Sequence, residues 1–213
     1  MRRLKMQQNK TKGFLFSFCG LDGCGKTTML TKLKKDLEKE FQILLTKQPT
    51  DAVRQSEIFR TYMDCPNHEA FDYRSLSLLA ASDRLQHVNK VIKPAMQQGD
   101  IVICDRYFYS CLANLRARGF TADKWIYEIG KSIVTPDVSF FFDVPVEVAV
   151  ERVRNRPTEK DRYIDMELQY KLRDEYRAIC KANDGVLIST EMSVDDSYAI
   201  VKGEVERVMK NVH

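Results

Sequence analysis

The sequence lacks a long apolar run and a strong excess of charge of one sign. No stretch approaches the ~18 apolar residues that a membrane-spanning helix needs, and residues 1–12 (MRRLKMQQNKTK) lack the apolar centre of a secretory signal. The formal net charge is +4, from 34 Lys+Arg and 30 Asp+Glu that are spread along the chain. We therefore expect no membrane and no nucleic-acid partner, and a site for small anions instead.

The sequence also has no C-x-x-C pair, no internal repeat and no low-complexity tract. Two of its six cysteines, Cys19 and Cys104, lie in apolar runs, which favours reduced, partly buried thiols in a cytoplasmic protein. The length of 213 residues is enough for one domain with a sizeable core. We expect residues 1–12 to form a disordered basic tail and residues 13–213 to form a single domain.

A phosphate-binding motif follows the first apolar run, residues 14–19. It matches the G-x-x-x-x-G-K-[ST] pattern, with a predicted strand before it and an amphipathic helix after it. An ordinary glycine-containing turn is the alternative, and the number of matched positions disfavours it. Backbone N–H groups and the helix N-terminus of such a loop surround phosphates. The residues predicted to contact ATP or its Mg²⁺ here are Gly20, Gly23, Cys24, Gly25, Lys26, Thr27 and Thr28.

Strand-like and helix-like segments alternate along the rest of the chain. Strands are predicted at residues 14–19, 42–46, 101–104, 138–144 and 186–189, and helices at 56–63, 73–96, 110–118, 121–133, 145–156, 165–183 and 194–209, after the helix that begins near Thr27. This order predicts an α/β protein of the P-loop NTPase fold, with a five-stranded parallel sheet and helices on both faces. Ligands bind outside the carboxyl ends of the strands in such a sheet.

Two predicted strands end in an acid, and either acid could hold Mg²⁺ through water beside the phosphate loop. Asp105 is the better candidate because Arg106 next to it supplies a fixed cation for a phosphate. Asp143 precedes Pro145 and a helix, so we interpret it as a helix N-cap or turn residue.

Arginines supply the other candidate site residues. Arg84 stands alone in the middle of a predicted helix, where an arginine is usually a surface group. Four more arginines crowd one polar segment, and the residues alone do not decide between a solvated face and a mobile lid over about residues 152–163. These arginines are Arg152, Arg154, Arg156 and Arg162.

Taken together, these segments resemble the thymidylate kinase family of P-loop nucleoside monophosphate kinases. GLDGCGKTT is similar to the family's phosphate loop, LLAASDRLQH to the helix whose arginine binds the acceptor phosphate, and DRYFYS to its DR[YH]xxS segment. PDVSFFFDVPVEVAVERVRNR, followed by DRY, resembles the fourth strand, the next helix and an arginine-bearing lid. The order and spacing agree from about residue 13 to residue 209.

The resemblance implies transfer of the γ-phosphoryl group of ATP to dTMP, with Mg²⁺. Lys26 and Thr27 would serve ATP and the metal, with Arg152 beside the ATP and Asp105 beside the metal. Asp22 would orient the acceptor, and Arg84 and Arg106 would clamp its phosphate. Some relatives place an arginine where this chain has Gly23, so the catalytic cation is expected from Arg154 or Arg156, with Arg162 behind them. The family commonly forms homodimers, and the apolar stripe of residues 76–91 is a candidate interface or a core-facing surface.

Three departures from the family pattern concern the acceptor site. Lys47-Gln48-Pro49 replaces Arg-Glu-Pro, Ala80 replaces a phenylalanine that stacks on thymine, and Asn114-Leu115 replaces Tyr-Gln. Pro49, Ala80 and Asn114 are still expected to line the site. Without the aromatic platform the base site is expected to be wider or differently tuned, so another (deoxy)nucleoside monophosphate is the alternative acceptor.

Other function classes make different predictions. A GTPase switch needs an Asn-Lys-x-Asp segment, which is absent. A deoxynucleoside kinase typically carries a glutamate where Gln48 stands and a serine where Tyr107 stands. A regulator that binds nucleotide without turnover is compatible with the altered base contacts, but the retained phosphate-binding residues disfavour it.

Overall fold

The computed structural model describes residues 1–64, 72–160 and 163–210. Its centre is a five-stranded sheet in the order β2-β3-β1-β4-β5, and all neighbouring strands are parallel. The strands are β1 Phe14–Gly20, β2 Ile43–Lys47, β3 Ile101–Asp105, β4 Val138–Asp143 and β5 Val186–Ser189. The predicted fold class is therefore confirmed, and every strand boundary lies within one residue of the one expected.

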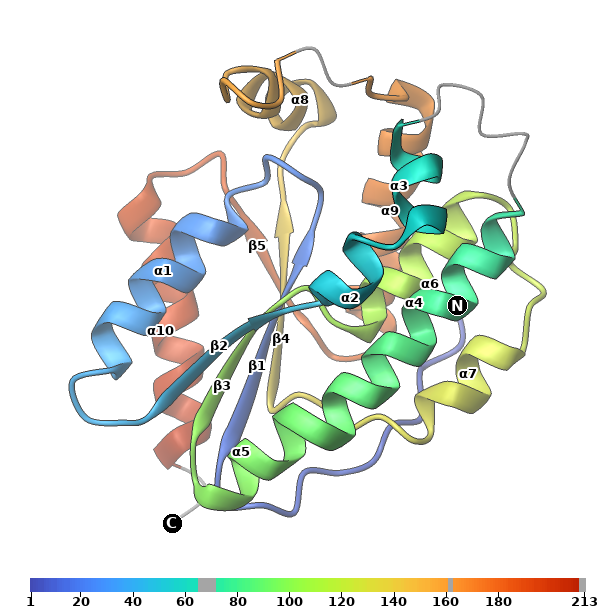
Figure 1. Cartoon of the computed structure of the whole chain (residues 1–213). Coiled ribbons are helices and arrows are strands. Elements are labelled where there is room, and N and C mark those ends of the chain that lie inside the picture. The colour runs from blue at the N-terminus through green and yellow to red at the C-terminus, as the bar shows by residue number, and fades with distance from the viewer. Residues whose placement is uncertain (65–71, 161–162, 211–213) are drawn as a thin grey trace.

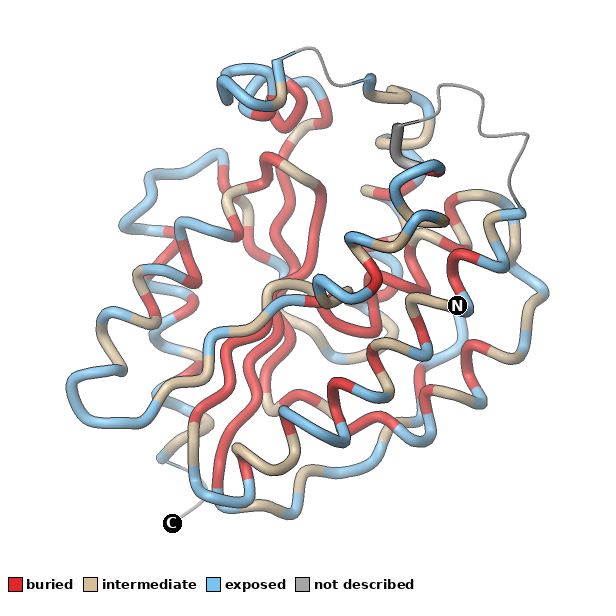
Figure 2. The backbone as a smooth tube through the Cα atoms, in the orientation of Figure 1, coloured by how far each residue is buried: buried red, intermediate tan, exposed pale blue. Residues whose placement is uncertain are grey.

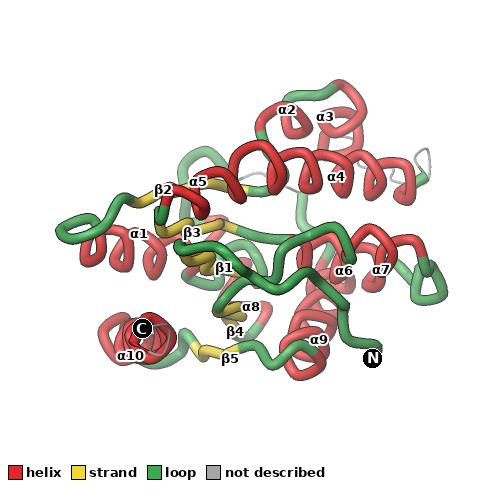
Figure 3. Tube along the Cα trace, turned by 90° about the horizontal axis from the view of Figure 1, so that it is seen from below, coloured by secondary structure: helices red, strands yellow, loops and turns green. Residues whose placement is uncertain are grey.

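Helices cover both faces of the sheet (Figures 1 and 3). One face carries α1 and α10, and the other carries α4, α5, α6, α7 and α9, while α8 lies above the carboxyl ends of the strands. The helices are α1 Lys26–Leu37, α2 Asp51–Arg54, α3 Glu57–Asp64, α4 Tyr73–His87, α5 Lys93–Gln98, α6 Phe108–Ala117, α7 Trp125–Gly130, α8 Val146–Arg154, α9 Met166–Ala182 and α10 Val194–Lys210.

The core lies along the three central strands. Every residue of β1 and β4 is buried, because helices cover both sides (Figure 2). Phe18 of β1 stacks on Phe142 of β4, with ring centroids 5.5 Å apart. Burying such a side chain contributes about 1.5–3 kcal/mol, so these packed rings stabilise the centre of the sheet.

The helix predicted over residues 73–96 is continuous but changes its winding. A π-helical turn, Val88–Ile92, separates α4 from α5. Gly99, with φ of 97°, follows α5 as its C-cap. Pro94 lies at the start of α5 and cannot donate a backbone hydrogen bond, so a wider turn ahead of it fits the sequence. The helix predicted over residues 121–133 is shorter, because only α7 is helical there.

The N-terminal segment is not the disordered tail that its composition predicted. The Gln7 N–H donates to the Ile133 carbonyl at 2.9 Å, and the Thr135 N–H donates to the Gln7 carbonyl at 2.7 Å. Leu4 is 5% exposed and packs against Gly130, whose missing side chain leaves room for it. The alternation of one buried leucine with polar neighbours was too short a pattern to identify this packing from sequence.

Candidate functional site

The phosphate loop joins β1 to α1 at the carboxyl end of the sheet. Gly25 precedes α1 with φ of 90°, and no side chain caps the first helical N–H groups. Those N–H groups and the helix dipole are therefore available to an anion. The Lys26 ammonium donates to the carbonyls of Gly20 at 3.1 Å and Leu21 at 2.6 Å, which holds it inside the loop.

Position 23 requires glycine because of the surrounding atoms as well as the backbone conformation. Its φ is 82°, and a Cβ there would lie 2.1 Å from the Ala149 carbonyl oxygen of α8. Because α8 packs so closely on the loop, an arginine at position 23 would need a backbone shift. A cation for phosphate at this point has to come from another segment.

A cavity of about 430 Å³ opens over the phosphate loop. Lys26, Thr27, Thr28 and Arg152 line it, together with residues that follow β5. Arg152 donates to the Thr190 carbonyl at 3.1 Å, and the Thr190 hydroxyl donates to the Cys24 carbonyl at 3.1 Å. The predicted position of Arg152 beside the loop is thus found in the structure.

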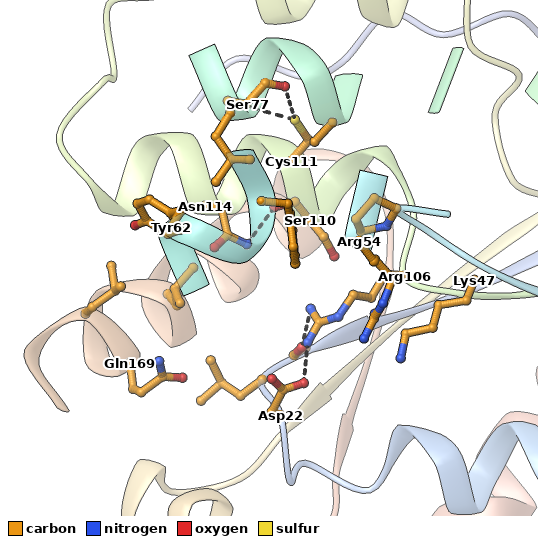
Figure 4. Close-up of a pocket in the computed structure, with 18 of the residues that line it drawn as sticks. Asp22, Lys47, Arg54, Tyr62, Ser77, Arg106, Ser110, Cys111, Asn114 and Gln169 are labelled. Carbon is orange, nitrogen blue, oxygen red and sulfur yellow. Dashed lines mark hydrogen bonds and ion pairs between the residues drawn. The ribbon is translucent and has the colours of Figure 1, made fainter. Parts of the chain in front are cut away.

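A second, larger cavity of about 870 Å³ lies on the α4 and α6 side of the loop. Its two ends differ in chemistry (Figure 4). Lys47 and Arg106 lie with Asp22 at one end, whereas Tyr62 and Asn114 lie at the other. The residues that line both cavities are Asp22, Lys47, Arg106 and Arg156. The two cavities therefore meet at a cationic junction.

Arg106 is held at this junction by its backbone and by three side-chain contacts. It has φ of 66°, and its N–H donates to the Phe18 carbonyl at 2.8 Å. The guanidinium donates to Asp22 Oδ1 at 2.6 Å, to the Gly20 carbonyl at 3.2 Å and to the Tyr176 hydroxyl at 3.0 Å. Asp22 and Arg106, which were each expected at the acceptor, are thus in direct contact.

Arg84 is not the surface group that its isolated position in a helix favoured. It is 3% exposed, lines the larger cavity, and donates to the Ala80 carbonyl at 2.9 Å. Its Nε is buried without a hydrogen-bond partner among the described residues. A buried guanidinium with an unused donor fits an anionic or carbonyl ligand.

His87 and Gln48 form a buried network beside Arg84. The His87 ring nitrogens contact Thr46 Oγ1 at 3.0 Å and Gln48 Nε2 at 3.1 Å. Burial lowers the pKa of His87, and the Arg84 charge lowers it further against the opposing effect of Asp83. His87 is therefore neutral near pH 7, and Gln48 faces it rather than the cavity.

The space beside Ala80 is bounded by groups that the sequence did not identify. The Arg118 guanidinium lies 3.9 Å above the centre of the Tyr73 ring. It donates to the Tyr62 hydroxyl at 2.8 Å and to Asn114 Oδ1 at 3.0 Å. Arg54 and Gln169 also line this cavity. These residues come from α2, α3, α4, α6 and α9, so only tertiary packing brings them together.

The residues present fit a Mg²⁺ ion held beside phosphates. Asp105 Oδ1 is buried and has no hydrogen-bond partner within the described part of the chain, while Oδ2 lies 3.6 Å from Lys47 Nζ. Asp105 and the exposed Thr27 line the same cavity. No cluster of three or more potential His, Cys, Asp or Glu ligands occurs in residues 1–64, 72–160 and 163–210. Mg²⁺ in kinase sites takes most of its ligands from phosphates and water.

Some predicted positions differ from expectation. Arg154 is exposed and lines neither cavity, whereas Arg156 lines both. Arg162 lies outside the described residues.

The N-cap interpretation of Asp143 is wrong, because its carboxylate pairs with Arg173 at 2.7 Å and Arg177 at 2.6 Å. Pro145 precedes α8 instead, and no side chain caps that helix.

Comparison with known proteins agrees with this geometry. A family model described as thymidylate kinase matches residues 18–199. A probable thymidylate kinase of Pyrococcus horikoshii is 34% identical over 202 residues, covering 91% of this chain and 98% of the relative. A thymidylate kinase of Geobacillus sp. (strain WCH70) is 37% identical over 199 residues, covering 89% and 94%. Within the described residues, no helix is both long and apolar enough to cross a membrane.

Proposed function

The chain belongs to the thymidylate kinase family of ATP-dependent phosphotransferases, and we propose that it transfers the γ-phosphoryl group of ATP to dTMP, giving dTDP and ADP. The observation that carries this proposal is the junction of the two cavities. Asp22, Lys47, Arg106 and Arg156 line both the cavity over the phosphate loop and the cavity beside α4 and α6. A donor and an acceptor phosphate can therefore meet beside these cations.

The protein contributes to this reaction mainly by positioning the substrates and neutralising charge. The acceptor phosphate is already an anion near neutral pH, so no residue has to deprotonate it. Lys26 and the N-terminus of α1 would hold the ATP phosphates, while Arg84 and Arg106 would hold the acceptor phosphate. When bound, Mg²⁺ would neutralise charge on the β- and γ-phosphates. Thr27 and, through water, Asp105 are the residues that would hold it.

We assign the catalytic lid cation to Arg156 rather than to Arg154. The support is that Arg156 lines both cavities and Arg154 lines neither. Both side chains are exposed, so each is free to reorient when the lid closes. For Arg162, which the resemblance places behind this cation, we propose a contact with the acceptor.

The identity of the acceptor base, thymine, is the most specific element of the proposed function. Ala80 leaves the acceptor cavity without the aromatic platform of the family pattern, and Tyr73 and Arg118 bound that end instead. The alternative is therefore the same chemistry on another (deoxy)nucleoside monophosphate.

A coupled assay of ADP release over all common ribo- and deoxyribonucleoside monophosphates tests the function. We expect the highest kcat/KM with dTMP. A different preferred base would select the alternative acceptor, and no ADP release with any acceptor would contradict the kinase function and favour a regulator. Thymidine in place of dTMP should give no product, which separates this enzyme from a deoxynucleoside kinase.

We also propose a homodimer and a cytoplasmic location. Most of the apolar stripe on α4 and the following turn faces the core, since Leu76, Val88 and Ile92 are buried, but Leu78 is 46% exposed. Light scattering during size-exclusion chromatography measures the mass, and a monomer at micromolar concentration would contradict the dimer.

The proposed cytoplasmic location is supported by the cysteines. Free, buried thiols at the five described cysteines fit a reducing compartment.

A further inference from the structure

We propose that Tyr176 of α9 is a positioning residue that aims Arg106 at the acceptor phosphate. The inference rests on the proposed function, because it assigns Arg106 to that phosphate. The pattern of motifs did not single out Tyr176, which lies in the middle of a helix that follows the lid segment. Its hydroxyl reaches Arg106 across 70 residues of sequence.

The hydrogen bonds around Tyr176 have a defined direction. The Arg106 guanidinium has no acceptor atom, so the Tyr176 hydroxyl accepts from Arg106 Nη1 at 3.0 Å. The same hydroxyl then donates its proton to Ser110 Oγ at 3.0 Å. Ser110 belongs to α6, three residues after Tyr107. The hydroxyl therefore links α9 both to the first turn of α6 and to the arginine that lies between the two cavities.

Tyr176 itself cannot easily move. It is 4% exposed, and its ring packs against Phe141 of β4 with centroids 6.5 Å apart. On the same helix, Arg173, one turn before Tyr176, and Arg177, the next residue, pair with Asp143 at the end of β4. These contacts fix α9 against the sheet, so the hydroxyl is a stationary acceptor for Arg106.

The positions of the Arg106 partners show how the Tyr176 hydroxyl restricts the orientation of the guanidinium. Without this hydroxyl, the Arg106 guanidinium would keep only Asp22 and the Gly20 carbonyl as hydrogen-bond partners within the described residues, and both belong to the phosphate-loop segment. The guanidinium would then be held from one side alone. Tyr176 supplies the second direction, from the α9 side, that keeps the guanidinium at the boundary of the acceptor cavity. Hydrogen bonds to charged groups are stronger than neutral ones, so this contact matters for orientation.

Tyr176→Phe tests the role because it removes only the hydroxyl and keeps the packed ring. We expect kcat/KM for the acceptor nucleotide to fall about 10-fold while KM for ATP changes less than 2-fold. The matched control is Tyr198→Phe, since Tyr198 is also largely buried and donates its hydroxyl to Asp36 at 2.7 Å, but on α10. Equal losses in the two variants, or an equal loss for ATP and acceptor, would overturn the proposal.

A double-mutant cycle separates positioning from a general structural effect. If Tyr176 acts through Arg106, then Tyr176→Phe should have less than a 2-fold further effect on kcat/KM in an Arg106→Lys background. An undiminished 10-fold effect there would contradict the assignment. Ser110→Ala should give part of the Tyr176→Phe effect and should not add to it, because both act on one hydroxyl.

A spectroscopic measurement keeps the inference testable if the proposed function is wrong. The Arg106 Nε–H signal in a nitrogen–proton correlation spectrum can be assigned by its loss in Arg106→Lys. We expect it to shift or broaden in Tyr176→Phe and to stay unchanged in Tyr198→Phe. An unchanged signal would overturn the positioning role, whereas a changed signal with no turnover on any acceptor would contradict only the kinase proposal.

Discussion

Lys26 is positioned by contacts within its own phosphate-loop segment. Its ammonium is held against the Gly20 and Leu21 carbonyls inside the phosphate loop, and it is 6% exposed. Lys26→Ala should lower kcat more than 100-fold, because it removes a fixed cation from the ATP phosphates. Tm should fall by only a few degrees, because alanine loses the hydrogen bonds to the Gly20 and Leu21 carbonyls but keeps the helical backbone. Lys32→Ala, on the exposed side of the same helix, is the control and should keep normal activity.

Arg84 supports a selective prediction because it lines only the acceptor cavity. Arg84→Ala should raise KM for dTMP at least 10-fold and leave KM for ATP within 2-fold. Initial-rate kinetics with each substrate varied in turn provide the measurement. Arg74→Ala is a matched control on the same helix, where Arg74 pairs with Asp123 at 3.0 Å outside both cavities. A larger change for ATP than for dTMP would show that the two substrate sites had been exchanged.

At the scale of elements, α9 is tied to β4 through Asp143. Burial by itself would raise the pKa of this carboxyl, but hydrogen bonds from Arg173 and Arg177 lower it below its ordinary value of 3.8. A carboxyl with a lowered pKa in the folded state stabilises the protein above its unfolded pKa. That contribution is lost as the pH falls through the lower, folded-state pKa.

Asp143→Asn should therefore reduce the free energy of unfolding by about 1–3 kcal/mol at pH 7, because it leaves Arg173 without its carboxylate partner. The difference from the unmodified chain should shrink as the pH falls below the ordinary carboxyl pKa of 3.8. Urea unfolding at a series of pH values measures both effects. Asp195→Asn removes an exposed ion pair with Lys32 and should cost less than about 1 kcal/mol at any pH. A pH-independent loss in Asp143→Asn would contradict the ion-pair explanation.

Elements whose signals are local could be predicted from the sequence. The phosphate loop, the five strands and the acid-arginine pair at the end of β3 each depend on neighbouring residues, and they were correctly located. Tyr176, Arg118 and the partner of Asp143 were missed because their contacts join segments at least 30 residues apart. Gly23 occupies a variable position of the phosphate-loop pattern, and only the packing of α8 shows why a side chain is excluded there.

At the scale of the whole molecule, the strand order explains why distant motifs meet. β1 lies between β3 and β4 in the sheet, so the phosphate loop after β1 stands beside Asp105 and Arg106 after β3. The same parallel order places α8, which follows β4, against the loop (Figure 1). The carboxyl ends of the strands thus collect the residues that we propose bind ATP and the acceptor.

The N-terminal segment offers a test of stability across the whole molecule. Leu4 is 5% exposed, packs against Gly130, and its N–H donates to Asn183 Oδ1 at 2.9 Å. Leu4→Ala should therefore cost about 2–3 kcal/mol and lower Tm by roughly 4–10 °C. Lys5→Ala at the neighbouring exposed position should leave Tm unchanged. Since residues 1–12 line neither cavity, kcat at 25 °C should stay within 2-fold in both variants. Equal Tm values for Leu4→Ala and Lys5→Ala would mean that the segment behaves as the solvated tail that its composition predicted.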